Sequence, residues 1–352
     1  ISQTWTYGGI EFGVGRPELV GTHPDYRRRG LVRALLEEIH KQSAARGEMM
    51  QAITGIPWYY RQFGYEMALA LDAARFSYAP QAPKLEEGVQ EPFLVRPATE
   101  DDVPFLAQVY DAGTRRSLVA CTRDEAQWRY ELSGKSEPNV CRRDLRVIEA
   151  AGGERVGFLA LSIRLWRGTL GVWVHELKPG VSWLAVTPSV VRYLWALGKR
   201  WAAREPVNQM ERIAFRLGDE HPLYDVFHDL APDKRQTYAW SVRVPDLAAF
   251  IRKVAPVLEQ RLAESPLVGH GGELTISFYR SGLKLSFERG RLARVDSWQP
   301  TPEVRAGARF PDRTFVQLLL GHRSLEELKY AFADCTTAND EARALLEILF
   351  PK

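Results

Sequence analysis

The chain has 352 residues, of which 45% are hydrophobic and 26% are charged. This length can bury large interiors and predicts two or three globular domains, because a single hydrophobic core stops growing at roughly 250–300 residues. The 47 basic and 44 acidic residues leave a formal net charge of only +3. Such a balance gives no general attraction for a polyanion, so we expect no nucleic-acid partner.

The three cysteines Cys121, Cys141 and Cys335 are far apart and lack the spacing of a metal site. Their odd number is typical of a reducing cytoplasm rather than of a secreted disulfide framework. No stretch approaches the roughly 20 apolar residues that span a bilayer, and no signal peptide is recognised. We therefore expect a cytoplasmic, soluble protein without a bound metal or a membrane partner.

Residues 4–22 contain glycine turns between short apolar segments, which predicts two strands. Pro17 marks a bend or an edge position within them. We expect the second strand to continue through Val20 to Thr22, immediately before a basic loop.

A helix is predicted from Leu31 to Arg46, with apolar residues at Leu31, Leu35 and Ile39. Gly30 precedes this helix and Gly47 ends it. The first turn of a helix has unpaired N–H groups and partial positive charge.

Arg27, Arg28 and Arg29 lie directly before that first turn, and Gly30 allows a ligand to approach the backbone closely. These features together suit a diphosphate. The alternative is an ordinary solvated loop in front of an amphipathic helix.

The sequence Arg27-x-x-Gly30-x-Val32, which follows Val20-x-Thr22, resembles the acetyl-CoA-binding motif of the GNAT acyltransferase superfamily. In that family the loop holds the pyrophosphate of the coenzyme. Val32 stands where Gly or Ala is usual, but the Arg-Arg-Arg-Gly-Leu run is similar to the Eis (enhanced intracellular survival) branch, which tolerates a larger residue there. The resemblance implies acetyl-CoA as co-substrate, bound by Val20, Gly21, Thr22, Arg27, Arg28, Arg29, Gly30, Leu31 and Val32.

The segment from Tyr60 to Tyr65 is similar to the Tyr-x-x-Phe-Gly-Tyr signature of the Eis branch. In that branch the first tyrosine protonates the departing coenzyme thiolate, which implies this catalytic role for Tyr60. A phenol with an ordinary pKa of about 10 can protonate a thiolate held in contact with it. Tyr59 is the competing candidate, and we expect the other aromatic residues here to be core.

Two candidates remain for the general base. Glu18 would share a strand face with Val20 and Thr22, and some GNAT enzymes carry a glutamate on this strand; the alternative is a solvent-facing residue. The Eis resemblance implies instead that the C-terminal carboxylate takes the proton. We expect that part of the GNAT fold precedes Ile1 and that a few residues follow Lys352, placing the true terminus beside Tyr60.

A strand predicted from Met67 to Tyr78 ends the first unit, and proline and charge mark residues 79–92 as a linker. In the second unit, Thr99 and Asp102, and again Thr122 and Glu125, have capping-box spacing before helices. We predict a strand from residue 93, a helix at 126–132 and strands near 145–150, 155–165, 170–177 and 181–186. This order resembles a second GNAT domain, but residues 185–194 lack Arg-x-x-Gly, so we expect its cofactor site to be lost.

The third unit begins near Pro245. We predict a helix at 246–263, strands at 272–280, 283–287 and 292–298, and helical stretches at about 311–333 and 337–349. After two GNAT units, this α+β pattern resembles the sterol-carrier-protein-like domain that ends Eis-type chains.

The expected fold is therefore α/β and α+β, with two mixed-sheet GNAT domains, the first lacking its N-terminal part, and a sterol-carrier-protein-like domain. The expected domains are 1–78, which binds the coenzyme, then a linker at 79–92, then 93–244 and 245–352. The predicted enzyme is an N-acetyltransferase acting on a small-molecule or peptide primary amine by direct attack, and we expect a homo-oligomer. The alternative is a binding or carrier protein for acyl-CoA or lipid without turnover.

Overall fold

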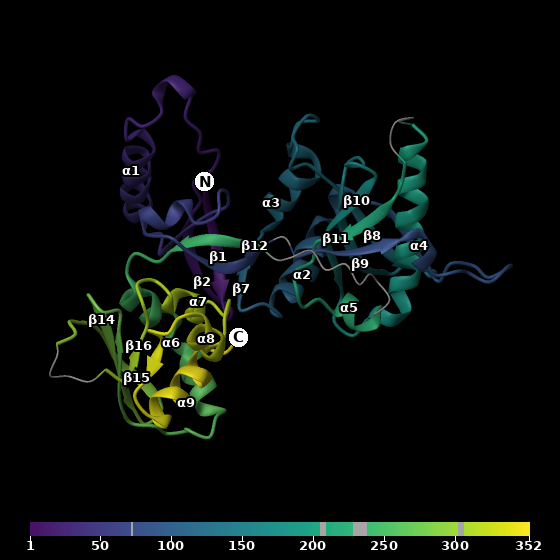
Figure 1. Ribbon diagram of the computed structural model, residues 1–352. Helices are drawn as coiled ribbons and strands as arrows, with labels where there is room; N and C mark the ends of the chain where they lie inside the picture. Colours follow the sequence, from purple (N-terminus) through teal and green to yellow (C-terminus); the bar gives the residue numbers. More distant parts are fainter. Residues whose placement is uncertain (72, 205–208, 228–237, 302–305) are drawn as a thin grey trace. The chain divides into compact units, whose positions relative to one another are not determined.

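The computed structural model describes residues 1–71, 73–204, 209–227, 238–301 and 306–352, and the chain folds into two compact units (Figure 1). Unit 1 comprises Ile1–Leu69, Ser117–Thr122 and Ala239–Lys352, and unit 2 comprises Ala70–Arg116 and Arg123–Tyr238. Both contain mixed sheets with helices, as predicted. The expected domain boundaries remain a prediction. None of the described helices is long and apolar enough to cross a membrane.

Unit 1 contains a six-stranded sheet with the order β4-β12-β3-β2-β1-β7. Its strands are β1 (Ser2–Tyr7), β2 (Ile10–Gly15), β3 (Met50–Ile53), β4 (Glu66–Leu71), β7 (Val119–Cys121) and β12 (Tyr238–Arg243). Strands β2 and β3 are parallel, and helix α1 (Leu31–Ala45) connects them. The predicted glycine turn joins β1 to β2, where Gly8 and Gly9 adopt φ values of 52° and 87°.

The prediction that the second strand reaches Thr22 is wrong, because β2 ends at Gly15. The N–H of Arg16 still donates to the carbonyl of Ile1, but Pro17 has no N–H with which to continue the pairing. Leu19 then leaves the extended region with φ 54°. The chain between β2 and α1 is consequently a long exposed loop.

The helix predicted at 31–46 is confirmed as α1, but the three apolar residues named for it do not all face the core. Leu36 and Ser43 are buried, while Leu35 is 60% exposed. Val32 and Ile39 are half-buried against the same core. The inward face is therefore the 32/36/39/43 stripe, which has true helical spacing.

The strand predicted at 67–78 is also wrong as a single element. It is divided into β4 and β5 (Arg75–Tyr78), which belong to different sheets. The periodicity of a sequence does not show where the chain leaves one sheet and enters another, because the segments before and after the break alternate in the same way.

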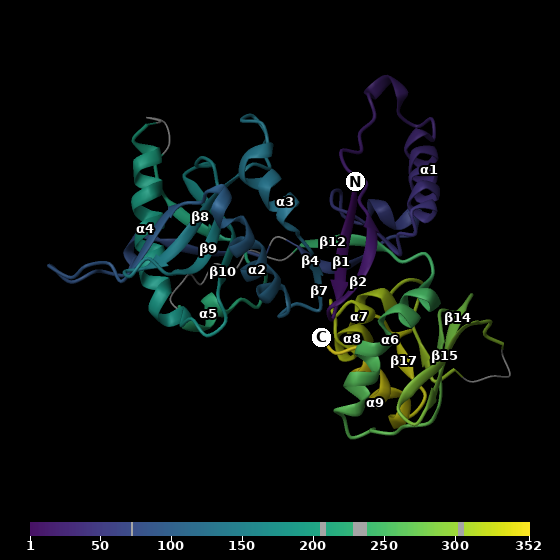
Figure 2. The ribbon, with the colours of Figure 1, turned by 180° about the vertical axis from the view of Figure 1, so that it is seen from behind.

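The C-terminal part of unit 1 forms a five-stranded sheet with the order β15-β14-β13-β16-β17. Its elements are α6 (Leu247–Ala263), β13 (Gly272–Ser277), β14 (Gly282–Glu288), β15 (Arg291–Trp298), β16 (Ala308–Arg309), α7 (Phe315–Leu319), α8 (Leu325–Ala331), β17 (Thr336–Thr337) and α9 (Asp340–Leu349). The turned view shows α6 and α9 side by side, next to α8 (Figure 2). Phe250 of α6 packs edge-on against Tyr7 and Phe12, so one core joins this part to the first sheet.

The single helical stretch predicted at 311–333 is wrong, since α7 and α8 are separate helices. Gly321 has φ 68°, which ends the first helical segment, and Ser324 starts the next with a capping box to Glu327. The likeness of this region to a sterol-carrier-protein domain remains a prediction.

Unit 2 contains a six-stranded sheet with the order β5-β11-β10-β9-β8-β6. Its other elements are η3 (Ala79–Gln81), β6 (Phe93–Pro97), η4 (Glu100–Asp102), α2 (Val103–Thr114), α3 (Glu125–Arg129), η5 (Tyr130–Gly134), β8 (Arg143–Ala150), β9 (Arg155–Ser162), β10 (Thr169–Leu177), α4 (Trp183–Ala202), β11 (Arg212–Phe215) and α5 (Pro222–Val226). The predicted Thr99 capping box is confirmed. The Thr122 cap is wrong, because Asp124 caps α3 in a box with Gln127.

The strand predicted at 181–186 is wrong, because these residues begin α4. Ser182 accepts a hydrogen bond from the N–H of Ala185 and so starts the helix two residues after Gly180. A short apolar run fits a strand or a buried helix equally well. The loop before α4 is therefore 178–182, which also contains no arginine, and loss of a cofactor site in this unit remains our prediction.

Candidate functional site

The connection from β2 to α1 begins where two parallel strands part. Strand β2 pairs with β3 only at Val14 with Met50 and at Gly15 with Gln51, whereas β3 continues to Ile53. Ligands of α/β folds bind beyond the carboxyl ends of parallel strands. In Figure 1 this connecting loop extends beyond α1, on the side of unit 1 away from β14 and β15.

Gly30 is the residue that makes the start of α1 suitable for an anion. It has φ 74° and forms the N-cap, and as a glycine it makes no side-chain capping bond to the first turn. Because glycine lacks a Cβ, it adopts this left-handed conformation at little cost. The N–H groups of the first turn and the positive end of the helix dipole remain available to a ligand.

The three arginines of the loop are all exposed. Arg27 Nε donates to the carbonyl of Thr22 at 3.4 Å, and the Arg29 guanidinium lies 5.2 Å from the centre of the Tyr26 ring. Arg28 adopts φ 60°, a conformation uncommon for a residue with a side chain. Within the part of the chain that the structure describes, none of the three forms an ion pair, so their charges are free to attract an anion.

The other predicted coenzyme residues lie on the same segment. Val20, Gly21 and Thr22 are in the exposed loop instead of a strand, and Leu31 is 40% exposed. Val32 points the other way and packs against the cluster around Tyr60. Their contacts with a coenzyme remain a prediction.

Tyr60 is only 5% exposed and lies in the short helix η2 (Tyr59–Phe63). It shares a hydrophobic cluster with Leu36 of α1, Ile53 of β3 and Tyr65. A Cβ at Gly55 would lie 3.2 Å from the Tyr60 hydroxyl, so the backbone approaches this phenol closely. Packing therefore fixes the predicted acid against the helix that carries the arginine loop.

Sequence reasoning missed a polar pair behind Tyr60. His40 Nε2 of α1 is 2.9 Å from the Tyr65 hydroxyl, and the Tyr65 ring packs edge-on against Tyr60. Burial, with the nearby Arg243 guanidinium, lowers the pKa of His40 to about 4. Burial raises the pKa of Tyr65, which Arg243 opposes. The side chains of His40 and Tyr65 are thus both neutral near pH 7. The sequence carries no sign of this pair, because a single histidine has no motif spacing that would mark it.

Of the two candidates for the general base, only Glu18 was predicted to lie on a strand. Glu18 is an exposed loop residue that pairs with Arg16, so its predicted position on a strand face is wrong. Lys352 Nζ pairs with Glu327 of α8 at 2.5 Å. The role of Glu18 or of the C-terminal carboxylate as the general base remains a prediction. Among the described residues, no group of three or more His, Cys, Asp or Glu side chains could hold a metal ion.

Residues 1–68 match a family model described as the acetyltransferase (GNAT) domain. No curated protein matches the sequence. Similar solved structures include a probable N-acyltransferase of Enterococcus faecalis V583, with 14% identity, a TM-score of 0.68 and coverage of 98% of this chain and 81% of that one. A GCN5-related N-acetyltransferase of Kribbella flavida has 18% identity, a TM-score of 0.63 and coverage of 99% and 80%. Eis1 of Mycobacterium abscessus has 17% identity, a TM-score of 0.62 and coverage of 100% and 83%.

At these identities the solved structures support the fold and its likeness to Eis1, while the family match concerns the N-terminal segment. That segment contains the arginine loop, α1 and Tyr60. The chain thus carries a GNAT acetyltransferase domain, and the prediction of an enzyme of this type is confirmed.

Proposed function

We propose that the protein transfers an acetyl group from acetyl-CoA to a primary amine by direct attack of the amine. The observation that carries this proposal is the glycine-capped start of α1, the helix that packs on the buried Tyr60. Three exposed arginines precede it, and none of them forms an ion pair with a described residue. Direct transfer needs orientation of the amine, removal of its proton, stabilisation of an oxyanion and protonation of the thiolate.

The arginine loop would hold the coenzyme pyrophosphate. Gly30 admits the phosphate oxygens to the backbone N–H groups of the first turn, and the guanidinium groups of Arg27, Arg28 and Arg29 supply charge-assisted hydrogen bonds. Backbone amides along Val20 to Thr22 would contact the pantetheine arm. The acceptor is a small-molecule or peptide amine.

Arg28→Ala is expected to weaken acetyl-CoA binding by about tenfold or more at low salt, because it removes charge-assisted contacts to the diphosphate. Isothermal titration calorimetry measures the change. Lys41→Ala is the matched control, since it removes one exposed positive charge from α1 about 15 Å along the axis from the first turn. Equal affinities for the wild type and Arg28→Ala would remove the loop from the coenzyme site.

The general base of the proposed reaction is the C-terminal carboxylate, with Glu18 as the other candidate. An α-carboxyl has an ordinary pKa of about 3.3–3.7, so it would need burial or a bridging water to act near neutrality. In the exposed loop Glu18 already pairs with Arg16, so its carboxylate has a cationic partner within its own segment.

Glu18→Gln is therefore expected to change the turnover number by less than about threefold, whereas loss of a true general base costs typically 10²–10⁴. Steady-state release of the coenzyme A thiol at saturating amine measures this. A loss of 100-fold or more with unchanged acetyl-CoA binding would instead assign the base to Glu18. Binding of acetyl-CoA without any thiol release across a panel of amines would favour the alternative of a carrier without turnover.

A further inference from the structure

A pocket of about 730 Å³ lies in unit 1, apart from the arginine loop. It is lined by Gly64, Val244, Leu247, Phe278, Tyr279, Arg280, Ser281, Asp312, Arg313, Phe315 and Val316. Small-molecule sites typically enclose roughly 300–1,000 Å³. The pocket is therefore large enough for an organic ligand, and the C-terminal part of unit 1 supplies most of its wall.

The charges around this pocket do not balance. Arg313 pairs with Asp312 at 2.7 Å, but Arg280 forms no ion pair with any described residue. Arg243 lies directly behind Gly64, where a Cβ would be 3.3 Å from its Nε, and its described side-chain partner is the neutral amide of Gln51. The guanidinium groups outnumber the single carboxylate, which favours an anionic ligand.

A second buried carboxylate nearby does not cancel this excess. The Glu66 side chain is completely buried, and its Oε2 lies 3.1 Å from Arg61 Nε. Gln317 Nε2 also donates to Glu66 at 3.3 Å. Glu66 thus has its own cation, and among the described residues no carboxylate pairs with Arg280.

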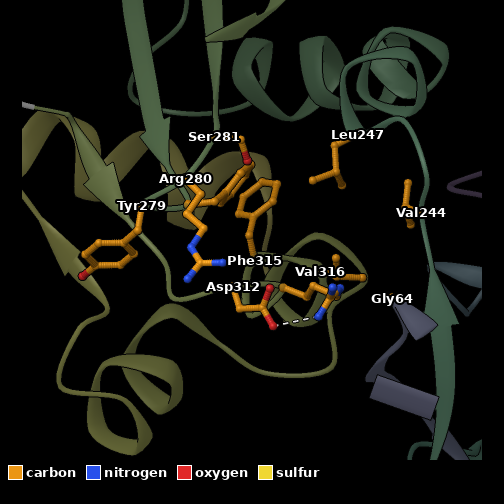
Figure 3. A pocket seen from close by; sticks show the side chains of 11 residues that line it. Gly64, Val244, Leu247, Tyr279, Arg280, Ser281, Asp312, Phe315 and Val316 are labelled. Carbon is orange, nitrogen blue, oxygen red and sulfur yellow. Dashed lines mark hydrogen bonds and ion pairs between the residues drawn. The ribbon is translucent and has the colours of Figure 1, made fainter. Parts of the chain in front are cut away.

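The apolar part of the wall is aromatic. The rings of Phe278 and Phe315 have centres 5.7 Å apart and are tilted by 38°. Figure 3 shows Arg280 and Asp312 reaching the space beside the Phe315 ring, while the Tyr279 ring points away from it. The Tyr279 hydroxyl donates to the carbonyl of Asp334 at 2.8 Å.

Backbone strain is concentrated at the same place. Tyr279 and Asp312 adopt φ values of 67° and 45°, and both line the pocket. Residues with side chains rarely occupy this left-handed region, and such strain clusters at ligand sites. Each of these two residues directly precedes an arginine that lines the pocket, Arg280 and Arg313.

We infer that this pocket binds an aromatic carboxylate, with its flat apolar body against Phe278 and Phe315 and its carboxylate at Arg280 and Arg313. Arginine suits this role, because its planar guanidinium binds a carboxylate through two parallel hydrogen bonds. Aromatic side chains provide offset or edge-on contacts to a flat ring. This inference does not depend on the proposed acetyl transfer.

The test uses 2-naphthoate as the probe and 2-naphthamide as its neutral counterpart, in calorimetric titrations without coenzyme. We expect 1:1 binding of 2-naphthoate and at least tenfold weaker binding of the amide, because the amide lacks the charge. Arg280→Ala should weaken 2-naphthoate binding at least tenfold. Arg291→Ala, an exposed arginine of β15 outside the pocket, should leave it unchanged.

Ser281→Trp provides a second variant that does not alter charge. Ser281 is exposed at the rim, so the indole should block the pocket without disturbing the core. The inference is overturned by any of three results: undetectable 2-naphthoate binding to the wild type, equal affinity for the acid and the amide, or wild-type affinity in both Arg280→Ala and Ser281→Trp. Octanoate binding as tightly as 2-naphthoate would overturn the aromatic specificity.

Discussion

Tyr60→Phe is expected to lower the rate of acetyl transfer by about 10²–10⁴, because it removes the proton donor for the departing thiolate and keeps the ring. Acetyl-CoA affinity should stay the same, since the arginine loop is untouched. The ring is 5% exposed and packs with Leu36, Ile53 and Tyr65, so phenylalanine fits the same space. Single-turnover thiol release at saturating amine separates the chemical step from binding.

Tyr59→Phe is the matched control for this experiment. Its ring lies beside Tyr60 at a centre distance of 5.2 Å, but Tyr59 is less deeply buried. We expect Tyr59→Phe to keep turnover within about threefold of the wild type, far less than the loss of a general acid. If Tyr60→Phe instead turned over normally and Tyr59→Phe did not, the two assignments would be exchanged.

Acidification is expected to destabilise unit 2 through two buried histidines. His175 lies on β10 and His221 caps α5, and their exposed fractions are 1% and 4%. His221 Nε2 donates to the carbonyl of His175 at 3.0 Å, and His221 Nδ1 accepts from the N–H of Leu223 at 3.2 Å. These partners fix the neutral form of His221, because a protonated ring could not accept the bond from Leu223.

The pKa values set the direction of the effect. Burial, followed by Arg116, lowers the pKa of His221 from 6.5 to about 3. Burial, His221 and Arg116 lower the pKa of His175 well below its ordinary value. The unfolded chain therefore binds more protons than the folded one below pH 6.5, and stability falls as the pH falls from there toward 3.

Arg116 and Glu176 lie near the two histidines and change the size of this pH-dependent loss of stability, but they do not reverse it near pH 5. Arg116 binds Glu176 through two hydrogen bonds of 2.7 and 2.8 Å, and Glu176 Oε1 is 4.0 Å from His221 Nε2. Burial raises the pKa of Glu176 against Arg116, which stabilises the fold on acidification and partly offsets the histidines. From His221 alone we expect a loss of about 2 kcal/mol between pH 7.5 and pH 5.

His175→Leu isolates one of the two titrations. Both ring nitrogens of His175 are buried without a hydrogen-bond partner among the described residues, so an apolar side chain of similar volume removes a buried polar group. We expect the variant to lose less stability than the wild type between pH 7.5 and pH 5 in urea unfolding. Because both proteins keep His40 of unit 1, its contribution cancels in the comparison.

His23→Leu is the matched control, since His23 is a surface histidine whose side chain is 68% exposed. It shows what the removal of a surface imidazole does by itself, and the effect of His175→Leu is compared with it. Identical pH dependence in His175→Leu and the wild type would show that His175 does not titrate on unfolding, contrary to its burial.

Local patterns identified most elements of the chain but not their partners. The strands predicted near 145–150 and 155–165 and the cap predicted at Thr99 rest on neighbouring residues alone, and the structure has β8, β9 and the capped helix start there. The split between β4 and β5, and the addition of β12 to the first sheet, depend on pairings with residues far away in sequence. Residues 181–186 were mispredicted because a short apolar run does not distinguish a strand from the start of α4.

The sequence by itself singled out the arginine loop and Tyr60 as the predicted coenzyme and acid residues, because both lie within short motifs of adjacent residues. Only the tertiary structure placed His40 against Tyr65 and Arg243 behind Gly64, and it moved Glu18 from a strand into an exposed loop. The physical reason is that a motif is a property of adjacent residues, whereas burial and charge compensation depend on groups that folding brings together from distant parts of the chain.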